Sequence, residues 1–259
     1  ADVFGVAGRR AVEERLNSLR EEVDADVCIV NGENIADGAG ITPKLADKLL
    51  DSGADMMVKD RAGNSYYVGE SDNTGREIFV LKRTPDGRVT TLAGNQKAGD
   101  EYRQVVLYSV GGMAFGGDDT LYFTDNSNVR KVTPDGKMTT LAGNLALEKP
   151  EGPKPESLVT RLFGIAVEAQ GNVFVADYGN RRVLKISADG GISTVLRAEQ
   201  PWAPTGIFFK DGNLYILEFG FTPPSTYLPR VRKLSSDGRV TTLATVGENG
   251  NAAVSESTD

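Results

Sequence analysis

One short phrase recurs along the chain and constrains its fold more than any other feature. Four Asp-Gly dipeptides begin at positions 86, 135, 189 and 237, at intervals of 49, 54 and 48 residues. Three of them lead into nearly the same words: RVTTLAGN at 88–95, KMTTLAGN at 137–144 and RVTTLATV at 239–246. Asp-Gly accepts the positive φ of a tight hairpin turn, so each copy predicts two strands joined by that turn.

The stretch from Leu162 to Leu196 is the clearest copy of the whole repeating unit. It contains four short β-type runs, at 164–167, 172–176, 183–186 and 192–196, separated by Asx- and Gly-rich turns. One four-stranded sheet of this kind has two apolar faces and buries neither alone, so copies must stack. A period near 50 residues with four strands in each copy predicts the blades of a β-propeller.

This pattern resembles the NHL-repeat family of six-bladed β-propellers. The resemblance rests on three segments and the TTLAGN phrases, and it covers about residues 56–247; the segments are Gly164–Val167, Gly171–Asp177 and Gly179–Val183. Arg181 stands where the family motif usually has the histidine of its name. The resemblance implies a mainly β chain of four NHL-like blades, whose strands are expected within residues 66–92, 113–141, 164–196 and 207–244.

Four blades are fewer than the six usual in that family, which favours an incomplete ring. Open sheet edges invite pairing with another chain, so we expect self-association through blade edges as one outcome. The fourth blade carries an insertion, FTPPSTYLP at 221–229, between its second and third strands. Residues 248–259 are rich in Asn, Ser and acidic side chains, and we expect them to form a disordered tail.

Composition excludes several classes of function. The chain has 259 residues and no histidine. Catalytic triads that need histidine, histidine general bases and histidine metal ligands are therefore ruled out. The formal net charge of −7 is concentrated in residues 1–58, and no basic patch stands out, so nucleic acid is not an expected partner. The sequence contains neither a visible signal peptide nor an 18-residue apolar run, so no membrane partner is expected and the compartment stays unknown. The single cysteine, Cys28, lies in the apolar run DVCIV and is interpreted as a core residue.

Residues 1–55 do not follow the propeller pattern and predict a small α/β segment. Apolar side chains at helical spacing favour a helix from Arg9 to Val23. A short strand is expected at Asp26–Val30, and Thr42-Pro43 begins a second helix that ends before Gly53. Residues 56–58 fit either a third strand of this segment or the innermost strand of the first blade.

This segment resembles the opening of a bacterial metallophosphoesterase family. The matching residues include Asp2–Gly5, the NGEN motif at 31–34 and the run from Gly40 to Lys44. The resemblance implies that Asp2, Glu33 and Asn34 bind metal for two-metal phosphodiester hydrolysis. After Ala54-Asp55, however, the family continues into a Gly-Asn-His motif, whereas this chain reads MMVKDRAGN. We therefore expect this site to be degenerate.

Three functions remain open at this point. The first is a non-enzymatic module that presents propeller loops to a protein or a small ligand, with Tyr178, Trp202 and Tyr227 as candidate binding aromatics. The second is a calcium-dependent propeller enzyme of the lactonase type, for which Asp125 and Asp177 hold equivalent repeat positions. The third is the phosphodiesterase of the N-terminal resemblance. We favour the first, expect no catalytic residue and no cofactor, and keep a divalent metal or calcium as the alternative.

Overall fold

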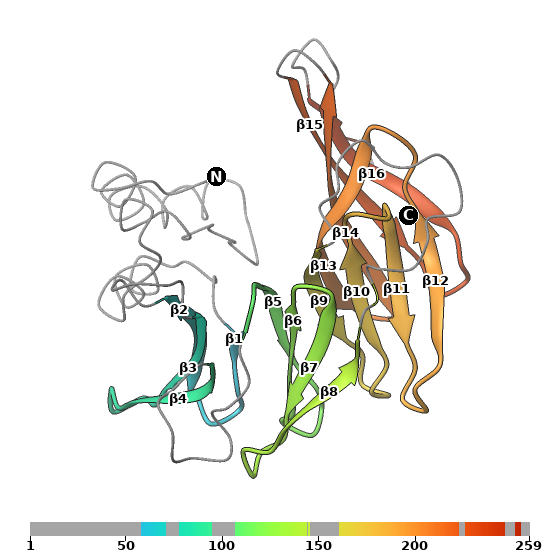
Figure 1. Cartoon of the computed structure of the whole chain (residues 1–259). Coiled ribbons are helices and arrows are strands. Elements are labelled where there is room, and N and C mark those ends of the chain that lie inside the picture. The colour runs from blue at the N-terminus through green and yellow to red at the C-terminus, as the bar shows by residue number, and fades with distance from the viewer. Residues whose placement is uncertain are drawn as a thin grey trace. The chain divides into compact units, whose positions relative to one another are not determined.

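The computed structural model describes residues 58–70, 78–94, 107–143, 145, 161–222, 226–246 and 252–254. Strands dominate this part of the chain (Figure 1). Their bounds are β1 Val58–Lys59, β2 Ser65–Glu70, β3 Ile78–Arg83, β4 Val89–Gly94, β5 Val110–Phe115, β6 Leu121–Asp125, β7 Asn128–Val132, β8 Met138–Ala142, β9 Leu162–Val167, β10 Val173–Asp177, β11 Arg182–Ile186, β12 Ile192–Arg197, β13 Trp202–Lys210, β14 Asn213–Thr222, β15 Thr226–Leu234, β16 Val240–Val246 and β17 Ala252–Val254.

These strands form four antiparallel sheets, each of which follows the order of the chain. The first compact unit, residues 1–107, contains the sheet β1-β2-β3-β4, which we call blade one. The second unit, residues 108–259, contains blade two (β5 to β8), blade three (β9 to β12) and blade four (β13 to β17). The expected mainly β fold built from propeller blades is therefore confirmed, with every predicted blade strand in its place.

The four Asp-Gly turns behave as the sequence predicts. Gly87, Gly136, Gly190 and Gly238 have φ values of 90°, 86°, 90° and 84°, the region that a side chain disfavours. After each turn, the pairing of the third strand with the fourth shifts its register at one equivalent place. The four shifts follow Val80, Val129, Val183 and Val231. The same β-bulge in every blade shows that the repeat extends to backbone detail.

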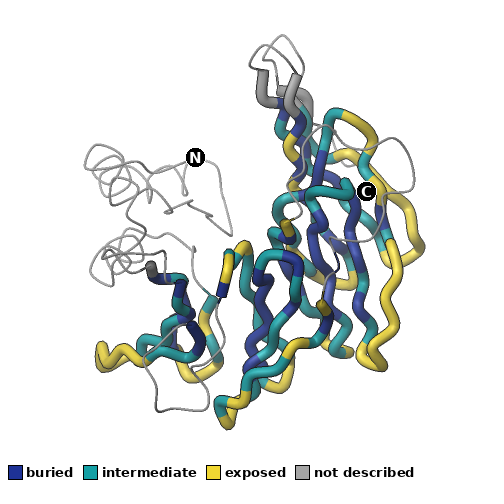
Figure 2. Tube along the Cα trace, viewed as in Figure 1, coloured by how far each residue is buried: buried dark blue, intermediate teal, exposed yellow. Residues whose placement is uncertain are grey.

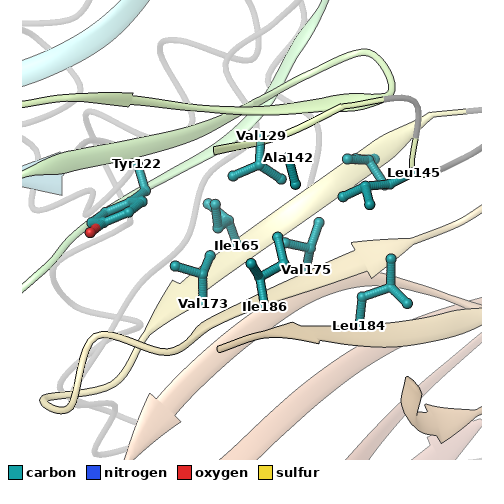
Figure 3. Packing of buried hydrophobic residues seen from close by; sticks show 10 residues of the cluster. Tyr122, Val129, Ala142, Leu145, Ile165, Val173, Val175, Leu184 and Ile186 are labelled. Atoms are coloured by element: carbon teal, nitrogen blue, oxygen red, sulfur yellow. The ribbon is translucent and has the colours of Figure 1, made fainter. Parts of the chain in front are cut away.

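Blade three lies between blades two and four and buries both of its faces. Side chains of β10 alternate across the sheet, as the strand period of two requires. Val173 and Val175 pack towards blade two in a cluster with Val129, Ile165 and their neighbours (Figure 3). Phe174 points the other way and stacks on Phe209 of blade four, with 5.7 Å between ring centroids. β10 is accordingly buried along its whole length (Figure 2).

Close contact between innermost strands explains glycines that lie within them. A Cβ on Gly164 of β9 would lie 2.8 Å from both the Thr205 carbonyl oxygen and the Ile207 nitrogen of β13. A Cβ on Gly112 of β5 would lie 3.0 Å from the Phe163 carbonyl oxygen. At Gly206 the nearest described atom is instead Cβ of Leu217, 3.2 Å away in the same sheet. Crowding by a neighbouring blade is thus found at Gly164, whereas Gly206 is crowded from within its own blade.

The end of the chain requires one correction. Ala252–Val254 pair with Ala244–Val246 as β17, so these three residues are not part of a disordered tail. The hydrogen bonds of the edge strand β16 explain the difference, because a free strand edge accepts even a short, weakly apolar segment. The predicted helices, the strand at 26–30 and Cys28 lie outside the residues that the structure describes.

Candidate functional site

A buried carboxylate lies at the same place in blades two, three and four. Asp125 ends β6, Asp177 ends β10, and Glu218 takes the equivalent position in β14, as the strand registers show. The side chains of all three are completely buried. In blade one the same register places Gly69 there. Each buried carboxylate needs a cationic partner, because an unpaired charge in the interior is costly.

Arginines on the third strand of each blade supply that partner. Arg182 Nε donates to Asp177 at 2.7 Å, and Asn180 donates to both oxygens of the same carboxylate. Arg130 donates from Nε and Nη2 to Asp125 at 3.2 and 3.1 Å. Asp125 also accepts backbone hydrogen bonds from Tyr108 and Ser109. These carboxylates therefore hold strands and loops in place.

Blade four differs from the others because it carries an arginine at both of the positions used elsewhere. Arg230 occupies the place of Arg182, and Arg232 occupies the place of Arg130, one step on either side of the equivalent valines. Both guanidinium groups bind the single buried carboxylate of Glu218. A second carboxylate, Glu199, lies across the same two arginines from the loop that leads into β13. We call these four side chains the blade-four charge cluster.

The two carboxylates of the charge cluster have opposite exposure. The Glu218 side chain is fully buried, whereas that of Glu199 is 58% exposed. The hydrogen bond from Arg230 to Glu199 is the main cause of a lowered Glu199 pKa, and burial opposes it. Arg230 also lies over the Trp202 ring, 4.1 Å from its centroid, in a cation–π contact. The cluster thus reaches solvent through Glu199 and contacts the ring of Trp202.

The predicted binding aromatics have different surroundings. Trp202 is half-buried beneath Arg230, and Tyr178 is half-buried with its ring 5.2 Å from that of Phe163. Both therefore pack within the protein. The Tyr227 backbone pairs with Phe221 in the long β14–β15 hairpin, but its side chain lies outside the described residues. Their proposed part in binding stays a prediction.

The metal ligands inferred from resemblance all lie outside the described residues. Asp2, Glu33 and Asn34 precede the first described residue. In the described part of the chain no group of three or more Cys, Asp or Glu side chains could hold a metal ion. Asp125 and Asp177 are among these residues, and their oxygens accept the arginine hydrogen bonds given above. The calcium hypothesis consequently has no ligand set to name among these residues.

Sequence reasoning missed the arginines of these sites. A signal was present, because an arginine stands one residue before or after the valine of each third-strand phrase in blades two to four. The doubled form RVR occurs only in blade four, at 230–232. Glu199 carried no such signal, since it lies in a connecting loop and approaches the arginines only in the folded blade.

Comparison with known proteins divides the chain in two. Residues 1–71 match the family described as YmdB-like protein, a span that continues past residue 55 through β1 and β2. A 2',3'-cyclic-nucleotide 2'-phosphodiesterase from Bacillus subtilis is 31% identical over 101 residues, which are 37% of this chain and 38% of that protein. The chain therefore spans well under half the length of this curated relative.

Solved structures similar to the chain are propeller-like proteins of low sequence identity. Virginiamycin B lyase from Staphylococcus aureus is 11% identical with a TM-score of 0.44, covering 78% of this chain and 84% of the lyase. A putative gluconolactonase is 15% identical with a TM-score of 0.47, covering 71% and 60% of the two chains. Within the described residues no helix is long and apolar enough to cross a membrane.

Proposed function

We propose that the propeller part of the chain is a non-enzymatic binding module. Its binding surface lies at the end of the blades where the second strand ends and the third strand begins. The observation that carries this proposal is the pairing of each buried carboxylate at this end with arginine. A general acid or base needs a group that is free to exchange a proton with a substrate. The carboxylates of Asp125, Asp177 and Glu218 are instead held in ion pairs that support the loops.

The same end of the blades offers groups suited to recognition. Tyr108 is 67% exposed, and its backbone is fixed by the hydrogen bond to Asp125. Arg161 lies over the ring of Phe163 and donates a hydrogen bond to Ser109. Phe163 in turn packs against Tyr178. Aromatic and arginine side chains on a rigid support are the residue types that dominate binding energy at interfaces.

The β14–β15 hairpin adds a projecting element to this end. β14 has ten residues and β15 has nine, whereas β10 and β11 of blade three have five each. In Figure 1 the hairpin extends well beyond the neighbouring sheet. A long two-stranded arm on a stacked sheet gives a partner a surface that the shorter blades lack.

The substitution Tyr108→Ala distinguishes binding at this end of the blades from binding elsewhere on the protein. The experiment is a thermal-shift screen of the whole chain against small metabolites and peptides. We expect at least one probe to raise the melting temperature of the wild-type chain and to do so much less with Tyr108→Ala. Ile192→Ala is the matched control, because Ile192 is 47% exposed near the Asp-Gly turn at the other end of the strands. Probes that lose their effect equally in both variants, or in neither, would contradict the proposal.

The N-terminal segment supports a second candidate, a metal-dependent phosphodiesterase. The family match over residues 1–71 includes Asp2, Glu33 and Asn34, whose oxygens suit a divalent metal. A two-metal site needs more ligands than three, and the sequence contains no histidine. We expect no manganese-stimulated hydrolysis of a 2',3'-cyclic nucleotide and no stoichiometric manganese, iron or zinc after desalting. Hydrolysis that disappears in Glu33→Ala would establish this second function.

A further inference from the structure

Blade four contains more buried positive charge than its fold requires. Blades two and three each neutralise one buried carboxylate with one arginine, Arg130 or Arg182. Blade four sets two arginines against the one buried carboxylate of Glu218. Both arginine side chains are less than 10% exposed, so the second positive charge needs an anion close by. In the present structure Glu199 is that anion.

Glu199 holds its place in a way that an outside carboxylate could reproduce. One of its oxygens accepts a hydrogen bond from Arg230 Nη1, and the other lies 3.7 Å from Arg232 Nη1. Glu199 therefore bridges the two guanidinium groups from the solvent side, while Glu218 bridges them from the inside. Two neighbouring guanidinium groups match the two oxygens of a planar carboxylate. The looser contact with Arg232 and the exposure of Glu199 make displacement inexpensive.

Two buried donor groups of the described residues, one in the charge cluster and one on the neighbouring Trp202, have no hydrogen-bond partner. Among the described residues, Arg232 Nε and Trp202 Nε1 are buried N–H groups without a hydrogen-bond partner. A buried donor without an acceptor costs free energy that a suitable ligand or a bound water recovers. The cluster thus combines an exchangeable anion with hydrogen-bonding capacity that Glu199 leaves open.

We propose that Arg230 and Arg232 form a binding site for a carboxylate group of a ligand, which displaces Glu199 into solvent. The proposal rests on the binding function given above, because it names the ligand class for blade four at the same end of the blades. The carboxylate comes from a free organic acid or from an acidic peptide. Trp202 is the only tryptophan of the chain and contacts Arg230, so its fluorescence reports occupancy.

The test is a fluorescence titration of the whole wild-type chain with N-acetylglutamate amide, which carries the same carboxylate side chain as Glu199. The uncharged N-acetylglutamine amide is the matched probe, and sodium chloride keeps the ionic strength constant. We expect a saturable change in Trp202 emission with the acid only. Removing the internal competitor in Glu199→Ala should tighten binding about three- to fivefold, the factor that corresponds to losing one exposed ion pair. Glu168→Ala in blade three should leave the titration unchanged.

Each outcome decides the proposal. A response in Glu199→Ala without one in the wild-type chain would mean that Glu199 is a permanent internal ion pair, and the proposal would fall. Equal responses to the acid and the amide, or undiminished binding in Arg232→Gln, would also overturn it. If Arg232→Gln does not fold, the comparison of the two probes on the wild-type chain still decides. A short tetraglutamate peptide that binds more tightly than the free acid would identify peptide as the source.

The two proposals can fail separately. A negative titration together with probes that depend on Tyr108 would leave the binding function intact and remove only the carboxylate site. A positive titration without any Tyr108-dependent probe would support the carboxylate site and contradict the wider binding face.

Discussion

Blades three and four have nearly the same backbone repeat, yet one is covered on both faces and the other on one. In the second unit, blade three packs against both of its neighbours, and the side chains of β10 are all buried. On blade four, the face that points away from blade three carries exposed apolar side chains, with Phe208 at 50% and Leu217 and Phe219 at 36% and 39%. The same strand pattern therefore produces a structural core in one copy and an accessible surface in the next.

The charge sites follow the same division. Asp177 is sealed by Arg182 and Asn180, and Arg182 also donates to the Leu145 carbonyl that precedes blade three. The blade-four charge cluster instead reaches solvent through Glu199. In blade three the repeated ion pair is buried and stabilises the fold. In blade four an exposed carboxylate, Glu199, completes the ion pairs, and a ligand carboxylate can replace it. Four predictions test the contrast between blades three and four.

The largest effect is expected for Asp177→Ala. The substitution leaves the buried Arg182 without its counter-ion, a change that typically costs about 3–5 kcal/mol of folding free energy. The urea midpoint of the second unit, followed by Trp202 fluorescence, should fall accordingly. The matched change in blade four, Glu218→Ala, should cost less, because the exposed Glu199 still contacts both arginines, whereas Asp177→Ala removes the carboxylate that pairs with Arg182. A smaller loss for Asp177→Ala than for Glu218→Ala would break the comparison.

A somewhat smaller loss is expected for Gly164→Val. The new side chain would meet backbone atoms of β13 that cannot move without separating two blades, and overpacking of this kind costs about 2–3 kcal/mol. The measurement is again the urea midpoint of the second unit. An unchanged midpoint would show that the two innermost strands can separate freely.

Gly206→Ala sharpens the contrast at a position of the same repeat. Its Cβ would lie 3.2 Å from Cβ of Leu217, a contact that a shift of a few tenths of an ångström relieves, whereas a Cβ on Gly164 would lie 2.8 Å from backbone atoms. We expect a destabilisation below about 1 kcal/mol, whereas Gly164→Ala should cost more than that. Differential scanning calorimetry of the two alanine variants measures the difference directly. Equal losses would mean that another segment covers Gly206 as tightly as β13 covers Gly164.

The smallest effect is expected for Glu199→Gln, and it should depend on pH. The exposed ion pair contributes at most about 1 kcal/mol near neutral pH. The pKa of Glu199 is lowered in the folded chain, so its contribution is present above the unfolded pKa of about 4.3 and is lost as the pH falls through the lower folded value. The stability difference between wild type and Glu199→Gln should therefore disappear in acid. A difference that persists well below pH 4 would exclude this ion pair as its source.

The blades were predictable because their signals are local. An Asp-Gly pair sets a turn, alternation sets which side chains face each neighbour, and copies of one phrase reinforce each other. These features depend on residues close in sequence or on the repeat itself.

The candidate site was not predictable to the same degree, because it depends on burial. Asp177 and Glu218 look alike in sequence, and only the folded sheets show that both are sealed by arginine. Glu199 reaches Arg230 across 31 residues from a loop without a motif. Trp202 is predicted as a binding aromatic, although its ring lies beneath Arg230. Long-range pairing of this kind leaves no periodic trace along the chain.

The glycine contacts of the innermost strands have a consequence for engineering. β9 is in close contact with Gly112 of β5 on one side, and its own Gly164 is in close contact with β13 on the other. A second copy of blade three, inserted after Arg197, would therefore present to the first copy a strand with the same glycine at the same height. Its β10 would offer Val173 and Val175 to one neighbour and Phe174 to the next, as the original does. Copies of blade three therefore have surfaces that can pack against one another, so the propeller could be extended by inserting this blade repeatedly.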